Sequence, residues 1–170
     1  MTPQFPVDLT CLNQFKPAPW SQIPDFGLYV DQVITYIGQV YEPICGADVK
    51  QFLSAPMINN YVKGKLIPRP TGKKYSREQI ALLSMIVPLK QVCSMEEIRR
   101  MLTPANGGSV EALYGAFCAR CTRAMGALPS HGVGDVDCLD LAFDLAIQAA
   151  ACHAGCVAAL RAANAGAQPG

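Results

Sequence analysis

Two capping boxes fix where consecutive helices must begin in the middle of this 170-residue chain. Ser76 stands three residues before Gln79, and Ser94 stands three residues before Glu97. In such a pair the serine hydroxyl accepts a hydrogen bond from the backbone N–H three residues later, and the longer side chain bonds back to the serine N–H. Apolar residues follow Ser76 at helical spacing up to Pro88, which is expected to end or kink that helix. We therefore predict one helix that begins at 77 and another from 95 to about 102.

Helical spacing also marks two segments upstream of the capping boxes. Apolar residues recur at this spacing over residues 28–40, and Pro43 and Gly46 are expected to end that helix. Residues 56–63 form a short amphipathic pattern, with one apolar face and one face that carries two asparagines and a lysine. Gly64 is a suitable C-cap for this second helix.

The two ends of the chain differ from its middle. Residues 1–26 contain five prolines and the only tryptophan, which indicates an irregular arm lying on a folded body. Its expected anchors are Phe5, Phe15 and Trp20. Residues 105–170 are rich in alanine and are predicted to be mainly helical. We expect a helix at 109–127, a loop at 126–135 and a second helix at 137–163.

Positive charge is concentrated in one segment of a nearly neutral chain. Residues 50–77 contain seven of the fourteen basic residues, and no acidic residue lies between Asp48 and Glu78. The rest of the chain holds the other seven basic residues against thirteen acidic ones. Such asymmetry favours a surface for a polyanion, whereas a solvated basic loop is the alternative.

The same segment carries a resemblance to a known family of DNA-binding domains. The stretch MINNYVKGKLIPRP, followed by KKYSREQIALL and then by SMEEIRRML, resembles the DNA-binding domain of MerR-like regulators. It is also similar to an uncharacterised bacterial family, domain of unknown function eighteen thirty-six, whose members share the string Met-Ile-Asn-Asn-Tyr-Val-Lys. The resemblance covers about residues 28–104. It implies a winged helix-turn-helix in which helix 56–63 is the recognition helix and 68–75 is a basic wing.

The predicted fold is therefore mainly α, with three parts. They are an amino-terminal arm (1–26), a MerR-like winged helix-turn-helix domain (27–104) and a helical dimerisation or effector region (105–170). Since an asparagine side chain can form two hydrogen bonds with adenine, Asn59 and Asn60 are candidate base readers. Tyr61 is expected either to pack inward or to contact the DNA backbone. The remaining candidates for DNA contact are Lys63, Lys65, Arg69, Lys73, Lys74, Tyr75 and Arg77.

Eight cysteines raise the question of a metal site. The candidate ligands are Cys118 and Cys121, which form a C-x-x-C pair, and Cys152 and Cys156, which are four residues apart, with His131, Cys138 and His153 nearby in the sequence. Because the C-x-x-C pair lies within a helical pattern where small residues are common, buried structural thiols are the favoured interpretation. No metal or other cofactor is therefore predicted. Catalytic residues do not stand out either, so we do not expect an enzyme.

The sequence thus predicts a cytoplasmic transcription regulator that binds double-stranded DNA as a homodimer. A small-molecule effector is a further candidate partner. No membrane contact is expected, because the apolar run 80–89 is too short to span a bilayer. The longer stretch 145–165 is mostly alanine and contains Gln148, His153 and Arg161, so we interpret it as a soluble helix that packs closely. The start of the chain lacks the pattern of a signal peptide. Two alternatives remain: a protein-interaction module that keeps the fold without specific DNA binding, and a cysteine-based metal or thiol sensor.

Overall fold

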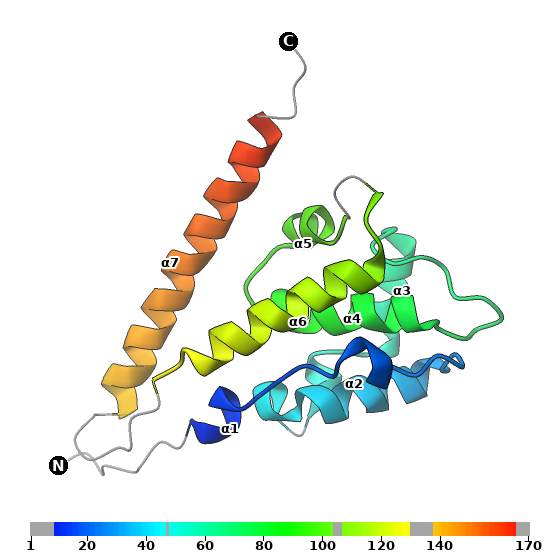
Figure 1. The fold of residues 1–170 in the computed structure, drawn as a ribbon, viewed down its shortest axis with the longest axis horizontal. Coiled ribbons are helices and arrows are strands. Elements are labelled where there is room, and N and C mark those ends of the chain that lie inside the picture. The colour runs from blue at the N-terminus through cyan, green and yellow to red at the C-terminus, as the bar shows by residue number, and fades with distance from the viewer. Residues whose placement is uncertain (1–8, 47, 104–106, 130–137, 166–170) are drawn as a thin grey trace.

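The computed structural model describes residues 9–46, 48–103, 107–129 and 138–165 (Figure 1). This part of the chain is mainly helical. Its α-helices are α1 (Thr10–Asn13), α2 (Val30–Cys45), α3 (Ala55–Lys63), α4 (Arg77–Leu89), α5 (Met95–Leu102), α6 (Val110–Gly126) and α7 (Cys138–Ala165). Two short 3-10 helices, η1 (Trp20–Gln22) and η2 (Val49–Gln51), lie between them.

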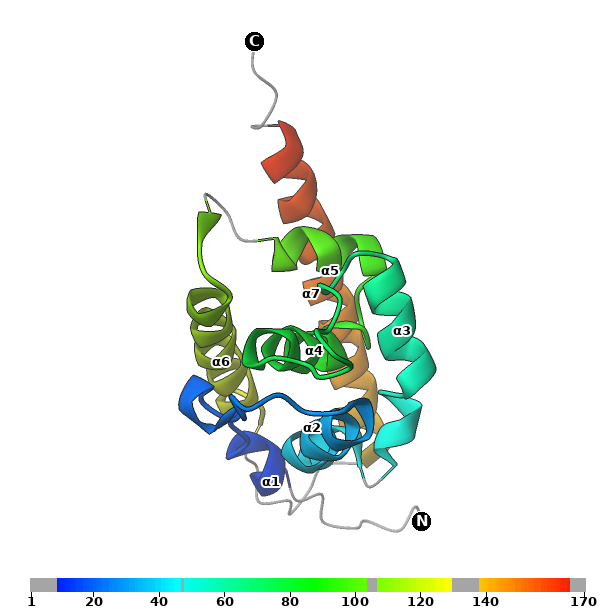
Figure 2. The same cartoon turned by 90° about the vertical axis from the view of Figure 1, so that its right-hand side faces the viewer.

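Helix α4 is the centre of the fold. Every residue from Gln79 to Val87 is buried, as expected for a helix that is covered on all sides. Figure 2 looks nearly along α4 and shows α2, α3, α5 and α6 arranged around it. The apolar run that followed the first capping box is therefore the core of the protein.

Both predicted capping boxes are present. The Ser76 N–H donates to Gln79 Oε1 at 2.7 Å, and the Gln79 N–H donates to Ser76 Oγ at 3.4 Å. At α5 the Ser94 N–H donates to Glu97 Oε2 at 2.7 Å, and the Glu97 N–H donates to Ser94 Oγ at 3.3 Å. Helix α4 ends at Leu89, one residue after Pro88, as the sequence predicted.

Helix α2 passes through Pro43 and ends at Cys45. Proline removes one intrahelical hydrogen bond, the one that the carbonyl of residue 39 would accept, and only two helical residues follow Pro43, so a bend there displaces little of the helix. The helix ends at Gly46, whose φ of +70° is a conformation that favours glycine, and whose N–H donates to Glu42 O at 2.8 Å. Of the two predicted end signals, Gly46 is therefore the one that stops the helix.

The amino-terminal arm packs against the helical body. Phe15 is buried beside Tyr41 of α2, with 5.6 Å between ring centroids. Trp20 packs against Tyr114 of α6 at 6.2 Å, and the Tyr114 hydroxyl donates to Ala18 O at 2.8 Å. Two of the three expected anchors thus lie on the body, whereas Phe5 is outside the described residues.

The described residues contain no β-strand, so a wing built from strands is not shown. The connection between α3 and α4 instead has two isolated antiparallel bridges, Thr71 with Lys74 and Leu28 with Tyr75. The second bridge ties the connection to the residues just before α2, with hydrogen bonds of 3.0 and 2.8 Å. This connection extends outward beside α3 in Figure 1.

Helix α7 lies apart from the core and contacts α5 (Figure 1). None of its described side chains is fully buried. Arg100 of α5 bonds to it at two points, the carbonyl of Leu160 and Asn164 Oδ1. By length and composition alone, Cys138–Asn164 is apolar enough to cross a membrane, and a single such helix is weak evidence for a membrane span. None of its apolar window is buried, so the expected close packing of 145–165 is not seen.

A glycine in α2 lets η2 approach closely. A Cβ atom at Gly38 would lie 2.9 Å from Val49 Cγ1, which is too close for van der Waals contact. Gly→Ala in a helix interior normally stabilises a protein by about 1 kcal/mol. Here we expect Gly38→Ala to destabilise it instead, by about 1–3 kcal/mol, because overpacking outweighs propensity. Urea unfolding measures the difference.

The control for this prediction is Gly115→Ala in α6, where a Cβ would meet no atom within 4 Å. That variant should be as stable as the parent protein or more so. The double variant Gly38→Ala with Val49→Ala should recover only part of the loss, because it removes the two clashing methyl groups but leaves the Cβ of residue 49 at 3.0 Å from the new Cβ. Equal effects of the two glycine substitutions would contradict the close approach of α2 and η2.

Candidate nucleic-acid interface

Helix α3 presents its polar face to solvent. Ile58 and Tyr61 point into the core, and Asn59, Asn60 and Lys63 are exposed on the opposite side. The helix forms because its apolar residues recur at helical spacing and because Pro56 occupies its first turn, where a proline breaks no hydrogen bond. The predicted helix 56–63 is thus confirmed, together with its exposed polar face.

The chain then turns back beside α3. Lys65 adopts a φ of +57°, and the Leu66 N–H donates to Tyr61 O at 2.9 Å. Leu66 and Ile67 are buried, so they anchor this turn to the core. Farther along, Gln79 Nε2 donates to Pro68 O at 2.9 Å. These contacts fix the start of the basic segment against the body of the protein.

The exposed face of α3 and the basic segment meet at one open groove of about 320 Å³. Asn59 and Lys63 line it from α3, and Arg69 and Lys73 line it from the following connection. We call these four residues, with Val62 and Pro70 between them, the basic groove. Three of the seven cations in the basic segment therefore share a single surface with a candidate base-reading asparagine.

The charges of the basic groove are not neutralised within the described part of the chain. No ion pair there involves Lys63, Lys65, Arg69 or Lys73. Lys74 differs, because its Nζ lies 5.2 Å from the centroid of the Tyr29 ring. On that side a second hollow includes Arg69 and Lys74 together with two acidic residues, Asp25 and Glu78. The positive potential should thus be strongest at Lys63 and Lys73.

Three of the predicted contact residues lie elsewhere. Tyr61 is 8% exposed and Tyr75 is 4% exposed, and burial raises the pKa of both phenols. Of the two roles expected for Tyr61, packing into the core and contact with the DNA backbone, the structure therefore shows the first. Arg77 holds the amino-terminal arm: its Nε donates to Ile23 O at 2.9 Å, and its guanidinium pairs with Asp25 at 3.3 Å.

The structure also adds a residue that the sequence did not suggest. Arg99 of α5 donates from Nη2 to Gly64 O at 2.8 Å, so its guanidinium sits at the carboxyl end of α3. A cation at this end is favourable because the last carbonyls of a helix carry partial negative charge. Thirty-five residues separate the two partners, so no local pattern could have paired them.

The four cysteines considered as metal ligands are not brought together. Cys118 and Cys121 lie in α6, and the Cys118 thiol donates to Ala18 O at 3.9 Å. Cys152 is exposed on α7, and Cys156 lies near Cys93. His131 is outside the described residues. Within the described residues, the side chains of metal-binding type that do come together are those of Cys93, Glu97 and His153.

The environment of Cys118 and Cys121 predicts low reactivity. Burial raises the pKa of both thiols, which reduces the thiolate that reacts with alkylating agents. We expect iodoacetamide to modify the exposed Cys11 and Cys152 first. Timed labelling followed by peptide mass spectrometry measures the order. If Cys118 is labelled as fast as Cys152, its thiol is not packed as described.

Comparison with known proteins gives one match. A family model described as Domain of unknown function (DUF1836) matches residues 18–117, which include α2 to α5, the basic groove and the first part of α6. No curated protein and no solved structure matches the chain. The resemblance to this family is thereby confirmed, and α7 lies outside the matched residues. The chain belongs to the family of the domain of unknown function DUF1836.

Proposed function

We propose that this protein is a transcription regulator that binds duplex DNA through α3 and the connection 68–75 that follows it. The observation that carries the proposal is the basic groove. It brings together Asn59 and three cations from two segments of the chain. These cations have no acidic partner in the described structure, so a polyanion is the partner that their charge would favour.

The order of elements supports α3 as the reading helix. Helix α2 precedes it and contacts it, as the first helix of a helix-turn-helix does. The major groove of B-DNA is about 12 Å wide and admits one α-helix. With Ile58 and Tyr61 held in the core, α3 would turn Asn59 and Asn60 toward the base edges. Each asparagine could then bond N6 and N7 of an adenine.

The cations would position the helix without reading sequence. Contacts from lysine and arginine to phosphate fix the register of a protein on DNA. On one side of the DNA major groove, phosphates would be bound by the three cations of the basic groove, Lys63, Arg69 and Lys73. Lys65 and Lys74 would extend this contact along the DNA backbone. In this proposal the bridged connection 68–75 acts as the short wing of a MerR-like winged helix-turn-helix.

The proposal includes a homodimer, since regulators of this kind read two half-sites through their own two-fold axis. Helix α7 is the candidate element for the second copy. Phe143 and Ile147 are 68% and 56% exposed and lie one turn apart on this helix. A small-molecule effector that acts through residues 105–170 would complete the regulator.

The test is a mobility shift with fragments of the protein's own genomic neighbourhood, at two salt concentrations and with excess competitor DNA. We expect a complex that resists competitor and weakens steeply with salt, because phosphate contacts release counterions. A footprint should then show two related half-sites. Binding that competitor abolishes would reject specific recognition. It would favour the alternative in which the basic groove binds an acidic protein.

A further inference from the structure

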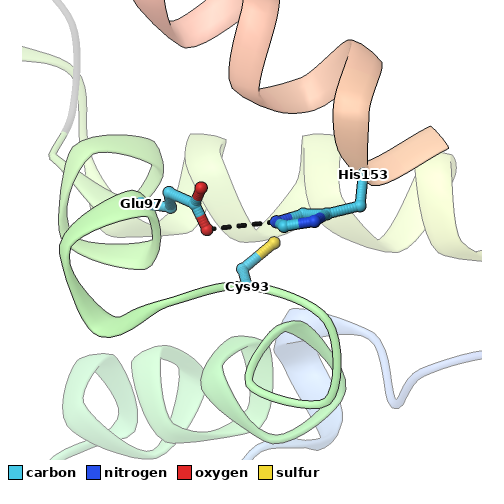
Figure 3. Close-up of side chains that lie close together, drawn as sticks. All are labelled: Cys93, Glu97 and His153. Carbon is cyan, nitrogen blue, oxygen red and sulfur yellow. Dashed lines mark hydrogen bonds and ion pairs between the residues drawn. The ribbon is translucent and has the colours of Figure 1, made fainter. Parts of the chain in front are cut away.

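Metal-type ligands from three parts of the chain meet beside α5. The Sγ of Cys93, a carboxylate oxygen of Glu97 and a ring nitrogen of His153 all lie within 4.8 Å of one another (Figure 3). Cys93 directly precedes the N-cap of α5, Glu97 lies in the first turn of α5, and His153 comes from α7. All three side chains are partly exposed, so an ion could reach them from solvent.

The local structure fixes the two ligands at α5. Glu97 is the reciprocal partner of Ser94 in the capping box, so its carboxylate cannot swing freely. The Cys93 N–H donates to Leu89 O at 2.8 Å, which holds that residue at the end of α4.

Helix α7 supplies two donors on one face. His153 Nε2 lies 3.3 Å from Glu97 Oε2, and Cys156, three residues farther along α7, lies near Cys93 but outside the 4.8 Å group. Positions three apart on a helix lie on the same side, so both can reach one ion. The donors already together are one sulfur, one imidazole and one carboxylate, and rotation of the Cys156 side chain would add a second sulfur.

We propose that Cys93, Glu97 and His153, with Cys156 completing the set when its side chain rotates toward them, form a binding site for a zinc-type divalent cation that fastens α7 to α5. Zinc is bound tetrahedrally by these ligand types, with Zn–N and Zn–O distances of about 2.0–2.2 Å. Two ligands of one tetrahedron are then separated by roughly 3.3–3.6 Å, which matches the 3.3 Å between His153 and Glu97. Binding would displace the protons of the two thiols to solvent and leave two metal–thiolate bonds.

The placement of the four residues favours a metal site over a simple ion pair. Isolated pairs near the surface contribute little, about 0–1 kcal/mol. Such a pair would also not explain why the Cys93 thiol lies within 4.8 Å of both of its members. The other hydrogen bonds between α5 and α7 in the described structure come from Arg100, which donates to Leu160 O and Asn164 Oδ1. A metal ion would therefore determine how firmly α7 is held.

Titration of the full-length, reduced protein with Co²⁺ tests the proposal. Tetrahedral Co²⁺ with thiolate ligands gives charge-transfer and d–d absorption bands, and we expect both to saturate at one equivalent. Zn²⁺ should displace the Co²⁺ and abolish the bands. Cys93→Ser, Cys156→Ser and His153→Gln should each weaken binding by at least about tenfold, since even outer-shell partners contribute that much.

The matched control is Cys152→Ser, which removes an exposed thiol adjacent to His153. Its affinity for Co²⁺ should equal that of the parent protein. Glu97→Gln is a second useful variant, because glutamine preserves the capping box but removes the anionic ligand. Circular dichroism should show that its helix content is unchanged while its affinity falls.

Hydrogen exchange gives a readout that is independent of the spectrum. Zn²⁺ should slow exchange in α7 of the parent protein, and it should have no such effect in Cys93→Ser. The proposal would be overturned if no thiolate band forms. It would also be overturned if Cys152→Ser weakens binding as much as Cys93→Ser, or if Zn²⁺ leaves exchange in α7 unchanged.

Discussion

Replacing Lys63 and Lys73 by glutamate together is expected to weaken binding to duplex DNA by at least roughly 100-fold. Each lysine should lose a charge-assisted phosphate contact, and contacts of this kind contribute about 1.5–3 kcal/mol. Two lost contacts correspond to more than 100-fold, since about 1.4 kcal/mol is a factor of ten. The two introduced carboxylates add repulsion. Both lysines line the basic groove and lack ion-pair partners in the described structure. The fold should therefore persist, with a loss of about 1 kcal/mol because a glutamate at position 63 places negative charge at the carboxyl end of α3.

The salt dependence gives the same prediction a second measurement. Each phosphate contact contributes about 0.9 to the slope of log K against log salt concentration. The slope should therefore fall by roughly 2 in the Lys63→Glu, Lys73→Glu variant. The loss should also be nearly equal for specific and nonspecific DNA, because phosphate contacts carry no sequence information. Fluorescence anisotropy over a salt series provides both quantities.

The matched control reverses two charges on another face. Arg120 and Arg123 are exposed on α6, which lies across α4 from α3 (Figure 2). Arg120→Glu with Arg123→Glu changes the net charge by the same amount. We expect it to weaken DNA binding far less than the groove variant does. Equal losses would show that the overall charge, and not the basic groove, governs the interaction.

The helices that surround the basic groove were predictable because their signals are local. Each capping box needs two residues three apart, and both boxes form as the sequence indicated. Helix α3 was predicted from its amphipathic spacing and from Gly64. Pro43 is the exception, since a proline in the last turn of a helix costs less than one in its middle.

The groove itself was predictable only in part. Asn59, Lys63, Arg69 and Lys73 are close in sequence, so one turn is enough to bring them together. Arg77 lies in the same basic segment, but contacts with Ile23 and Asp25 decide its position. Charge patterning shows that a basic segment exists, and it does not show which cations are engaged by distant parts of the chain.

The proposed metal site was predictable only in part, because the sequence pointed to His153 and Cys156 and gave no sign of Cys93 or Glu97. Glu97 and His153 are 56 residues apart and come together only where α7 lies against α5. The C-x-x-C spacing made Cys118 and Cys121 candidate metal ligands, but both belong to the face of α6 that packs against the core. Spacing identifies metal ligands well when they share one helix or one turn, as His153 and Cys156 do, and poorly when tertiary packing unites them.

Ile86→Ala is expected to have the largest effect on stability, a loss of about 2–5 kcal/mol in the free energy of unfolding. Ile86 is 0% exposed in α4, the helix around which the others pack, so its removal leaves a cavity that rigid neighbours cannot fill. Such a loss is a large part of the roughly 5–15 kcal/mol that typically stabilises a folded protein. Urea unfolding followed by circular dichroism measures it.

Ile147→Ala is the matched control, since it removes the same atoms from a side chain that is 56% exposed on α7. In an isolated chain its effect should be within about 0.5 kcal/mol of zero. A second copy bound to this face of α7 would change that result. The loss would then grow with protein concentration, because association adds to apparent stability by mass action. A large loss at Ile147 that is independent of concentration would instead mean that α7 packs against its own chain more closely than described.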